Sequence, residues 1–138
     1  MSANEDPVFI RGVERILERE DHWPREAYDF VRRTVERAIE NAAESGLRGH
    51  VAGPQIIEAA RDLALNDYGP AAAYLLDQWH LQSSTDVGHV VFLLIEEGLL
   101  AKSDDDRLED FENVLDLPAE LAAPFQPRGD KIDVEVIA

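Results

Sequence analysis

Apolar residues recur three or four positions apart in five separate segments of the chain. This spacing places them on one face of an α-helix, so each segment is predicted to be an amphipathic helix that packs on a core. The second segment carries the broadest apolar stripe, from Ala27 to Ala42, and the stripe includes Ile39. The five predicted helices cover residues 7–20, 24–46, 53–68, 70–79 and 84–97.

Residues that favour helix ends flank these segments. Asp6 and Pro7 suit the N-cap and the first position of the first helix. Ser84 or Thr85 is predicted to cap the fifth helix, and Gly98 follows its last turn. The expected boundaries therefore agree with the periodicity of the apolar residues.

Two short stretches after the fifth helix show the alternation of β-strands. Leu99 to Lys102 and Phe111 to Leu117 flank an acidic loop, which predicts a small hairpin. A third alternating stretch, residues 132–136, has three interpretations. It adds to the hairpin, it pairs with another copy of the chain to form a homo-oligomer, or it stays unpaired.

The order of these elements predicts a mainly α fold with about five helices plus a small β-hairpin. Residues 70–117 follow the order of a winged helix-turn-helix unit, with helix, polar turn, helix, Gly-Leu-Leu, strand, charged loop and strand. We therefore expect a winged-helix-like C-terminal half within one globular domain of residues 1–125. Residues 126–138 are expected to be a C-terminal extension with a possible strand.

The composition of the 138 residues excludes several classes of protein. Cysteine is absent, which excludes disulfide scaffolds, thiolate metal sites and cysteine nucleophiles. The longest strongly apolar run, Val90 to Ile95, is far shorter than the ~20 residues that a membrane-spanning helix needs. Residues 1–7 are polar and acidic and lack the features of a secretory signal. We therefore expect a cytoplasmic protein with no membrane partner.

The net charge is the most unusual property of the sequence. The chain has 29 Asp and Glu against 13 Lys and Arg, which gives −16, and only Lys102 and Lys131 are lysines. Two interpretations compete: an acidic surface for a basic partner, or a solubility adaptation to high salt, as in halophilic proteins. The scattered acids and the shortage of lysine favour the salt adaptation.

The distribution of this charge argues against DNA as a partner. Residues 1–80 carry 9 bases and 15 acids, a net −6, whereas residues 81–138 carry 4 and 14, a net −10. The predicted recognition helix, residues 86–97, has no Lys or Arg, although each phosphate contact needs a cation. A nucleic-acid-associated regulator stays an alternative that would use the arginines of the first half, Arg25, Arg32, Arg33, Arg37 and Arg48.

No sequence motif indicates a reaction. The histidines, His22, His50, His80 and His89, lack the spacing of local metal motifs, and the eight glycines form no phosphate loop. Asp104 and Asp106 fit the start of a calcium loop, but Leu108 occupies a ligand position. We therefore expect no catalytic residue, no metal and no cofactor, and the sequence favours a non-enzymatic protein.

Several short pieces occur together in a recognisable order. They are Ala27 to Val31, His50 to Gly53, Asp67 to Gly69, Leu75 to Leu81, Asp86 to Phe92, Glu97 to Lys102 and Asp110-Phe111. Over roughly residues 8–125, this combination resembles a small bacterial family of uncharacterised proteins. Ala52 and Val87 depart from the pattern. The resemblance implies no known activity, ligand or catalytic residue.

Five residues of these pieces are candidates for a polar, aromatic ligand-binding cleft, which would form if the C-terminal unit packs on the second helix. They are His50, Tyr68, Trp79, His89 and Phe111. The alternative is that they define the fold. The sequence as a whole favours a non-enzymatic cytoplasmic module that binds a protein partner, with a nucleic-acid regulator and a small-ligand protein as alternatives.

Overall fold

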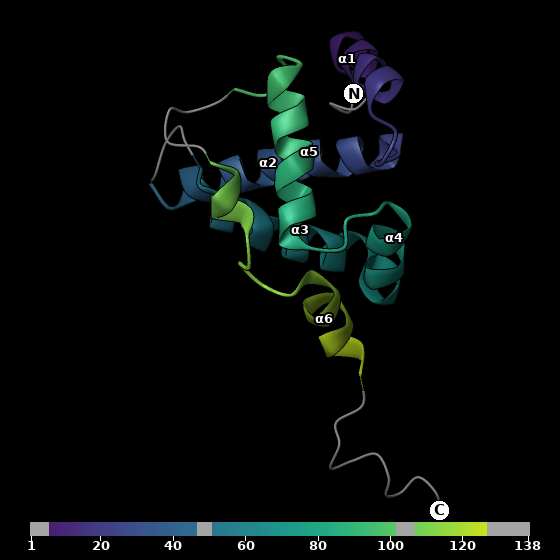
Figure 1. Ribbon diagram of the computed structural model, residues 1–138. Helices are drawn as coiled ribbons and strands as arrows, with labels where there is room; N and C mark the ends of the chain where they lie inside the picture. Colours follow the sequence, from purple (N-terminus) through teal and green to yellow (C-terminus); the bar gives the residue numbers. More distant parts are fainter. Residues whose placement is uncertain (1–5, 47–50, 102–106, 127–138) are drawn as a thin grey trace, which may run out of the picture.

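Helices dominate the part of the chain that the computed structural model describes, residues 6–46, 51–101 and 107–126 (Figure 1). The mainly α class is confirmed, and the five predicted helices are present with ends close to those expected. The α-helices are α1 (Pro7–Arg19), α2 (Arg25–Glu44), α3 (Gly53–Tyr68), α4 (Ala72–Gln78), α5 (Ser84–Glu96) and α6 (Leu117–Ala122). The 3-10 turns η2 (Gly69–Ala71) and η3 (Leu108–Phe111) lie between helices, and the 3-10 turn η4 (Ala123–Phe125) follows α6.

Side-chain caps fix the beginnings of three helices. The Asp6 carboxylate accepts a hydrogen bond from the Val8 N–H at 2.9 Å, as the sequence predicted. The predicted cap of α5 is wrong by one residue. Ser83 accepts the Asp86 N–H at 3.1 Å, while Ser84 is buried in the first turn. Asp116 caps α6 in the same way.

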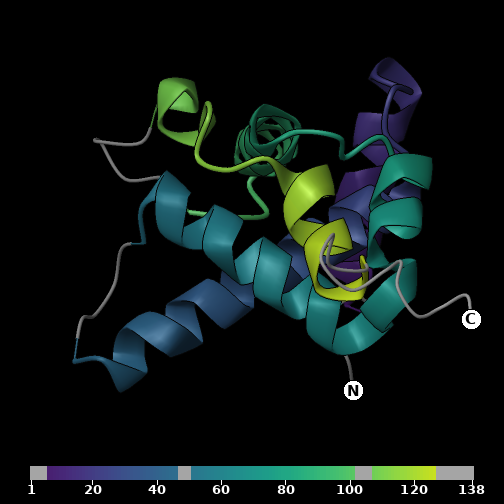
Figure 2. The ribbon, with the colours of Figure 1, turned by 90° about the horizontal axis from the view of Figure 1, so that it is seen from below.

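Three helices enclose most of the core. α2 and α3 lie side by side, and α5 crosses them steeply, so that Figure 2 shows α5 end-on while α3 lies across the view. α1 packs on α2 and α5, and α4 and α6 cover the side of α3 near its C-terminal end. The described helices therefore share one hydrophobic core.

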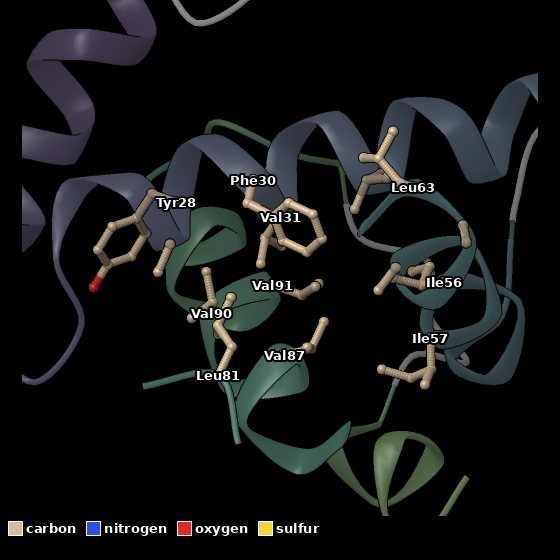
Figure 3. Close-up of a cluster of buried hydrophobic side chains, with 14 of the residues drawn as sticks. Tyr28, Phe30, Val31, Ile56, Ile57, Leu63, Leu81, Val87, Val90 and Val91 are labelled. Carbon is tan, nitrogen blue, oxygen red and sulfur yellow. The ribbon is translucent and has the colours of Figure 1, made fainter. Parts of the chain in front are cut away.

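The centre of this core is built from apolar side chains of α2, α3 and α5 (Figure 3). Phe30 and Val31 of α2 face Val87, Val90 and Val91 of α5, which follow the predicted helical spacing. One member of the predicted stripe is misplaced. Ile39 is exposed, whereas Ala38 and Ala42 of the same helix are buried, so the buried stripe of α2 passes beside Ile39.

Tyr28 is fully buried, yet its hydroxyl group points away from the apolar cluster of Figure 3. The hydroxyl makes no hydrogen bond to a described residue. Burial raises the pKa of Tyr28 to about 12, and the nearby Glu20 carboxylate adds to the shift. The phenol is therefore held in its neutral form.

The predicted hairpin is wrong in the described residues, because residues 99–101 and 107–126 contain no strand. Gly98 ends α5 with φ +77°, and the Leu99 N–H bonds to the Leu94 carbonyl at 2.9 Å, a helix-ending motif. The second predicted strand begins as the 3-10 turn η3, and Asn113 interrupts it with φ +53°.

Residues 108–111 pack closely against two glycines. A methyl group on Gly88 of α5 would lie 2.6 Å from the Phe111 Cγ. A methyl group on Gly53 would lie 2.7 Å from the Asp110 carbonyl oxygen. The turn is thus seated on α3 and α5 at points where only glycine leaves room for it.

The described part of residues 70–117 therefore shows no winged-helix arrangement. α5 is not an exposed recognition helix, since every residue of it except Glu96 is buried or half-buried and η3 packs across it. Residues 102–106, at the predicted hairpin loop, lie outside the described part. So does the alternating stretch 132–136.

Candidate functional site

The structure places the five residues of the predicted cleft in different surroundings. Tyr68 and Trp79 are in contact, with ring centres 5.8 Å apart, and both rings lie near Phe30 of α2. His89 lies beside Trp23 with ring centres 5.9 Å apart. Phe111 packs on Phe92 and Gly88, and His50 lies outside the described residues.

The contacts of Tyr68 connect helices. The Arg33 guanidinium of α2 donates to the Tyr68 hydroxyl at 2.7 Å and to the Asp67 carboxylate at 2.8 Å, at the end of α3. Trp79, at the C-terminal end of α4, packs against this Tyr68 ring. This network fixes the angle between α2, α3 and α4, which supports the interpretation of Tyr68 and Trp79 as fold-defining residues.

A groove that the sequence did not predict runs between α4, the turn before α5, and α6. Two adjoining cavities of about 130 and 410 Å³ share Gln82 and Pro118 as lining residues. Apolar side chains line most of the smaller cavity, namely Ala73, Leu76, Leu81, Pro118 and Leu121. We call these two cavities the α4–α6 groove.

The charged residues that line this groove are acidic. Asp77 lines the smaller cavity and accepts a hydrogen bond from the Gln82 side chain at 2.8 Å. Asp116 lines the larger cavity, and Asp86 lies nearby, where its carboxylate accepts the Gln82 N–H at 2.9 Å. No Lys or Arg of the described residues lines either cavity. The groove therefore combines an apolar floor with an anionic rim.

A second cluster gathers three of the four histidines around Trp23. The buried Trp23 indole lies 4.6 Å from the His22 ring and 5.9 Å from the His89 ring, between ring centres. Its N–H donates to the His80 carbonyl at 3.0 Å, and the His22 and His80 ring centres are 5.3 Å apart. The sequence could not indicate this cluster, because 57 residues separate Trp23 from His80.

The end of α4 determines where His80 lies. His80 has φ +62°, its N–H bonds to the Asp77 carbonyl at 3.0 Å, and the Leu81 N–H bonds to the Leu76 carbonyl at 2.9 Å. This is the helix-ending motif in which glycine is the usual left-handed residue. Leu81 is thereby buried against the core, while the His80 side chain is exposed.

Comparisons with known proteins do not assign either site. No family model matches the chain, and no curated protein and no solved structure is similar to it. Among the described residues, no group of three or more His, Asp or Glu side chains has the geometry of a metal centre. None of the described helices is both long enough and apolar enough to span a bilayer.

Proposed function

We propose that the protein is a cytoplasmic, non-enzymatic interaction module whose α4–α6 groove binds a protein segment with an apolar anchor and basic flanks. The observation that carries this proposal is the combination of an apolar cavity with a rim on which the charged residues that the structure describes are all acidic. The family resemblance of residues 8–125 is part of the same proposal and implies no competing activity.

The shape of the groove suits a peptide segment better than a metabolite. The smaller cavity, about 130 Å³, is well below the ~300–1,000 Å³ of typical small-molecule pockets, whereas the larger, about 410 Å³, is within that range but is lined largely by polar side chains. It has room for one aliphatic side chain, whose burial contributes about 1.5–3 kcal/mol. The larger cavity continues from it past Ser83, Asn113 and Asp116, and these polar groups suit a peptide backbone.

The charge of the groove selects the flanking residues of such a segment. Asp77 and Asp116 line it and Asp86 lies close by, so lysine or arginine side chains beside the anchor are attracted and acidic ones repelled. Such exposed charges mainly affect association and specificity, and salt screens them over about 8–10 Å. Binding is therefore expected to weaken with salt but to keep an apolar component.

Short labelled peptides with one leucine between arginines test the proposal. We expect micromolar binding by fluorescence anisotropy, and chemical-shift changes at the methyl groups of Leu76, Leu81 and Leu121. Versions with glutamate flanks, or with serine in place of leucine, are expected to bind at least tenfold more weakly. Shifts confined to another face of the protein, or equal binding of all versions, would overturn the proposal.

Charge variants distinguish the effect of the groove carboxylates on peptide binding from the effect of the overall negative charge of the chain. Asp77→Asn keeps an acceptor for Gln82, and Asp116→Ser keeps an N-cap, so the pair removes two charges with little loss of stability. A matched control removes two charges from exposed side chains on other elements, with Glu18→Gln and Glu44→Gln. We expect the first pair to weaken peptide binding and the control to leave it unchanged.

The two alternative functions have less support among the described residues. Arg25, Arg32, Arg33 and Arg37 each form an ion pair with a carboxylate, so they offer no uncompensated basic stripe for a nucleic acid. A small ligand in the predicted cleft would need His89 or Phe111 beside Tyr68 and Trp79. The described aromatic contacts place His89 and Phe111 beside other partners.

A further inference from the structure

His22 and His80 approach each other from two turns that are far apart in the sequence. His22 lies in the turn between α1 and α2, and His80 in the turn between α4 and α5. Their ring centres are 5.3 Å apart and the ring planes are inclined by 38°, so the imidazoles are not stacked. Both residues are exposed.

The separation of the rings agrees with two ligands of one tetrahedral metal ion. Zinc binds imidazole nitrogen at ~2.0–2.1 Å, which places each ring centre ~3.2 Å from the ion. Two such rings at a tetrahedral angle have centres ~5.2 Å apart, whereas a square-planar ion would bring them to ~4.5 Å. The observed 5.3 Å between the ring centres is compatible with the tetrahedral value.

We propose that His22 and His80 bind a zinc-class divalent ion, with water in the remaining positions. Imidazole ligands favour zinc and related ions over Mg²⁺ and Ca²⁺, which prefer oxygen ligands. The exposure of both residues leaves room for the water ligands. The neighbouring carboxylates Glu20 and Asp21 add negative charge that attracts a cation.

Trp23 and the local backbone hold the two histidines in place. The Trp23 indole donates to the His80 carbonyl at 3.0 Å, and its ring packs edge-on against His22. The backbone N–H of His22 donates a hydrogen bond to the Glu20 carboxylate at 3.3 Å. Both ligand-bearing turns are thus tied to one buried side chain, which reduces the ordering that metal binding must impose.

The identity of residue 80 supports a role for its side chain. Its backbone is left-handed, with φ +62°, at a helix end where glycine is the usual residue. A residue with a Cβ atom is strained there, and such strain concentrates at functional sites. Histidine at this position lowers the stability of the fold. Metal binding would give its side chain a function.

Zinc titration of the full chain tests the site. The chain, without an affinity tag and after chelator treatment, is titrated with zinc chloride by calorimetry and by NMR of the imidazole Cε1–H groups. We expect one ion per chain, micromolar affinity, and shifts at His22 and His80. His22→Gln and His80→Gly are each expected to weaken binding at least tenfold, whereas His89→Gln serves as the matched control with unchanged affinity.

The His80→Gly variant also separates metal binding from a structural role. Glycine accommodates φ +62° without strain, so this variant is expected to unfold at the same temperature as the parent chain, or higher, without zinc. Zinc is expected to raise the unfolding temperature of the parent chain and not that of the variant. No saturable binding, binding unaffected by either substitution, or an equal loss in His89→Gln would overturn the proposal.

Discussion

Gly88 is a position where a single methyl group is expected to disturb the packing of η3 on α5. In Gly88→Ala, the new Cβ atom would lie 2.6 Å from the Phe111 Cγ and 2.7 Å from its Cβ. The Phe111 Cβ is attached directly to the backbone of η3, so rotation of the side chain cannot relieve this contact. The whole turn has to move away from α5.

The expected free-energy change combines two opposing effects. Overpacking of a well-packed core costs about 1–3 kcal/mol. Replacing glycine by alanine within a helix contributes about 1 kcal/mol in the other direction. We therefore expect Gly88→Ala to lower the free energy of unfolding by up to about 2 kcal/mol, and the unfolding temperature by up to roughly 8 °C.

Gly12 of α1 provides a matched control. It is also buried in a helix, and its added methyl group would lie 2.6 and 2.8 Å from the two Cδ atoms of Leu99. These atoms end a flexible side chain that can rotate, so Gly12→Ala is expected to be neutral or up to about 1 kcal/mol more stable. Urea unfolding, followed by tryptophan fluorescence and circular dichroism, compares both variants. Equal stability of Gly88→Ala and Gly12→Ala would refute the assigned role of η3 packing.

Three further predictions concern ionisable groups. Arg15 and Arg19 hold the pKa of Glu97 below its ordinary value of 4.5, so this contribution to stability is present above that pH and is lost as the pH falls below it. Glu97→Gln is expected to flatten this part of the acid unfolding curve, and an unchanged curve would contradict the assignment. Burial raises the pKa of Asp29, so Asp29→Asn is expected to raise the unfolding temperature at pH 7, with a gain that vanishes below the ordinary pKa of 3.8. The pKa of Tyr28 is raised to about 12, so stability is expected to fall as the pH rises from 10 towards 12. Tyr28→Phe should remove that loss without destabilising the protein at pH 7, and this can be followed by thermal unfolding.

The sequence predicted the helices well because their signals are local. Apolar spacing and capping residues depend only on neighbours along the chain. The apolar spacing is satisfied in α1, α2 and α5, and a side chain caps the beginning of α1 and of α5. The hairpin prediction was wrong for the described residues because an alternation of apolar residues is equally compatible with a turn that buries one side chain in the core. Phe111 is buried through its contact with Gly88, and this contact between distant segments leaves no periodic pattern in the sequence.

The candidate sites were missed for a related reason. Local metal motifs place histidines three to five residues apart, whereas His22 and His80 meet only because α1–α2 and α4–α5 turns converge on Trp23. Of the five residues of the predicted cleft, Tyr68 and Trp79 are in contact, since both occur at helix ends that the fold brings together. The sequence could not show that a hydrogen bond from Arg33 of α2 to the Tyr68 hydroxyl holds this aromatic pair in place.

Ion pairs between distant helices change the interpretation of the net charge. Arg15 and Arg19 of α1 bind the carboxylate of Glu97, at the end of α5, at 2.6 and 2.8 Å. Arg61 of α3 lies 3.6 Å from Glu120 of α6. Part of the acid excess that a count assigns to the second half of the chain is therefore balanced by arginines of the first half.

The carboxylates of the α4–α6 groove differ from these balanced acids. Asp77, Asp86 and Asp116 accept hydrogen bonds from neutral donors, and none forms an ion pair with a described Lys or Arg. A general adaptation to salt requires only that acids be numerous and exposed, and it gives no reason for them to surround an apolar cavity. A basic partner gives such a reason. The two interpretations of the −16 charge can therefore both hold for this chain, with the salt adaptation accounting for the scattered acids and a partner accounting for those at the groove.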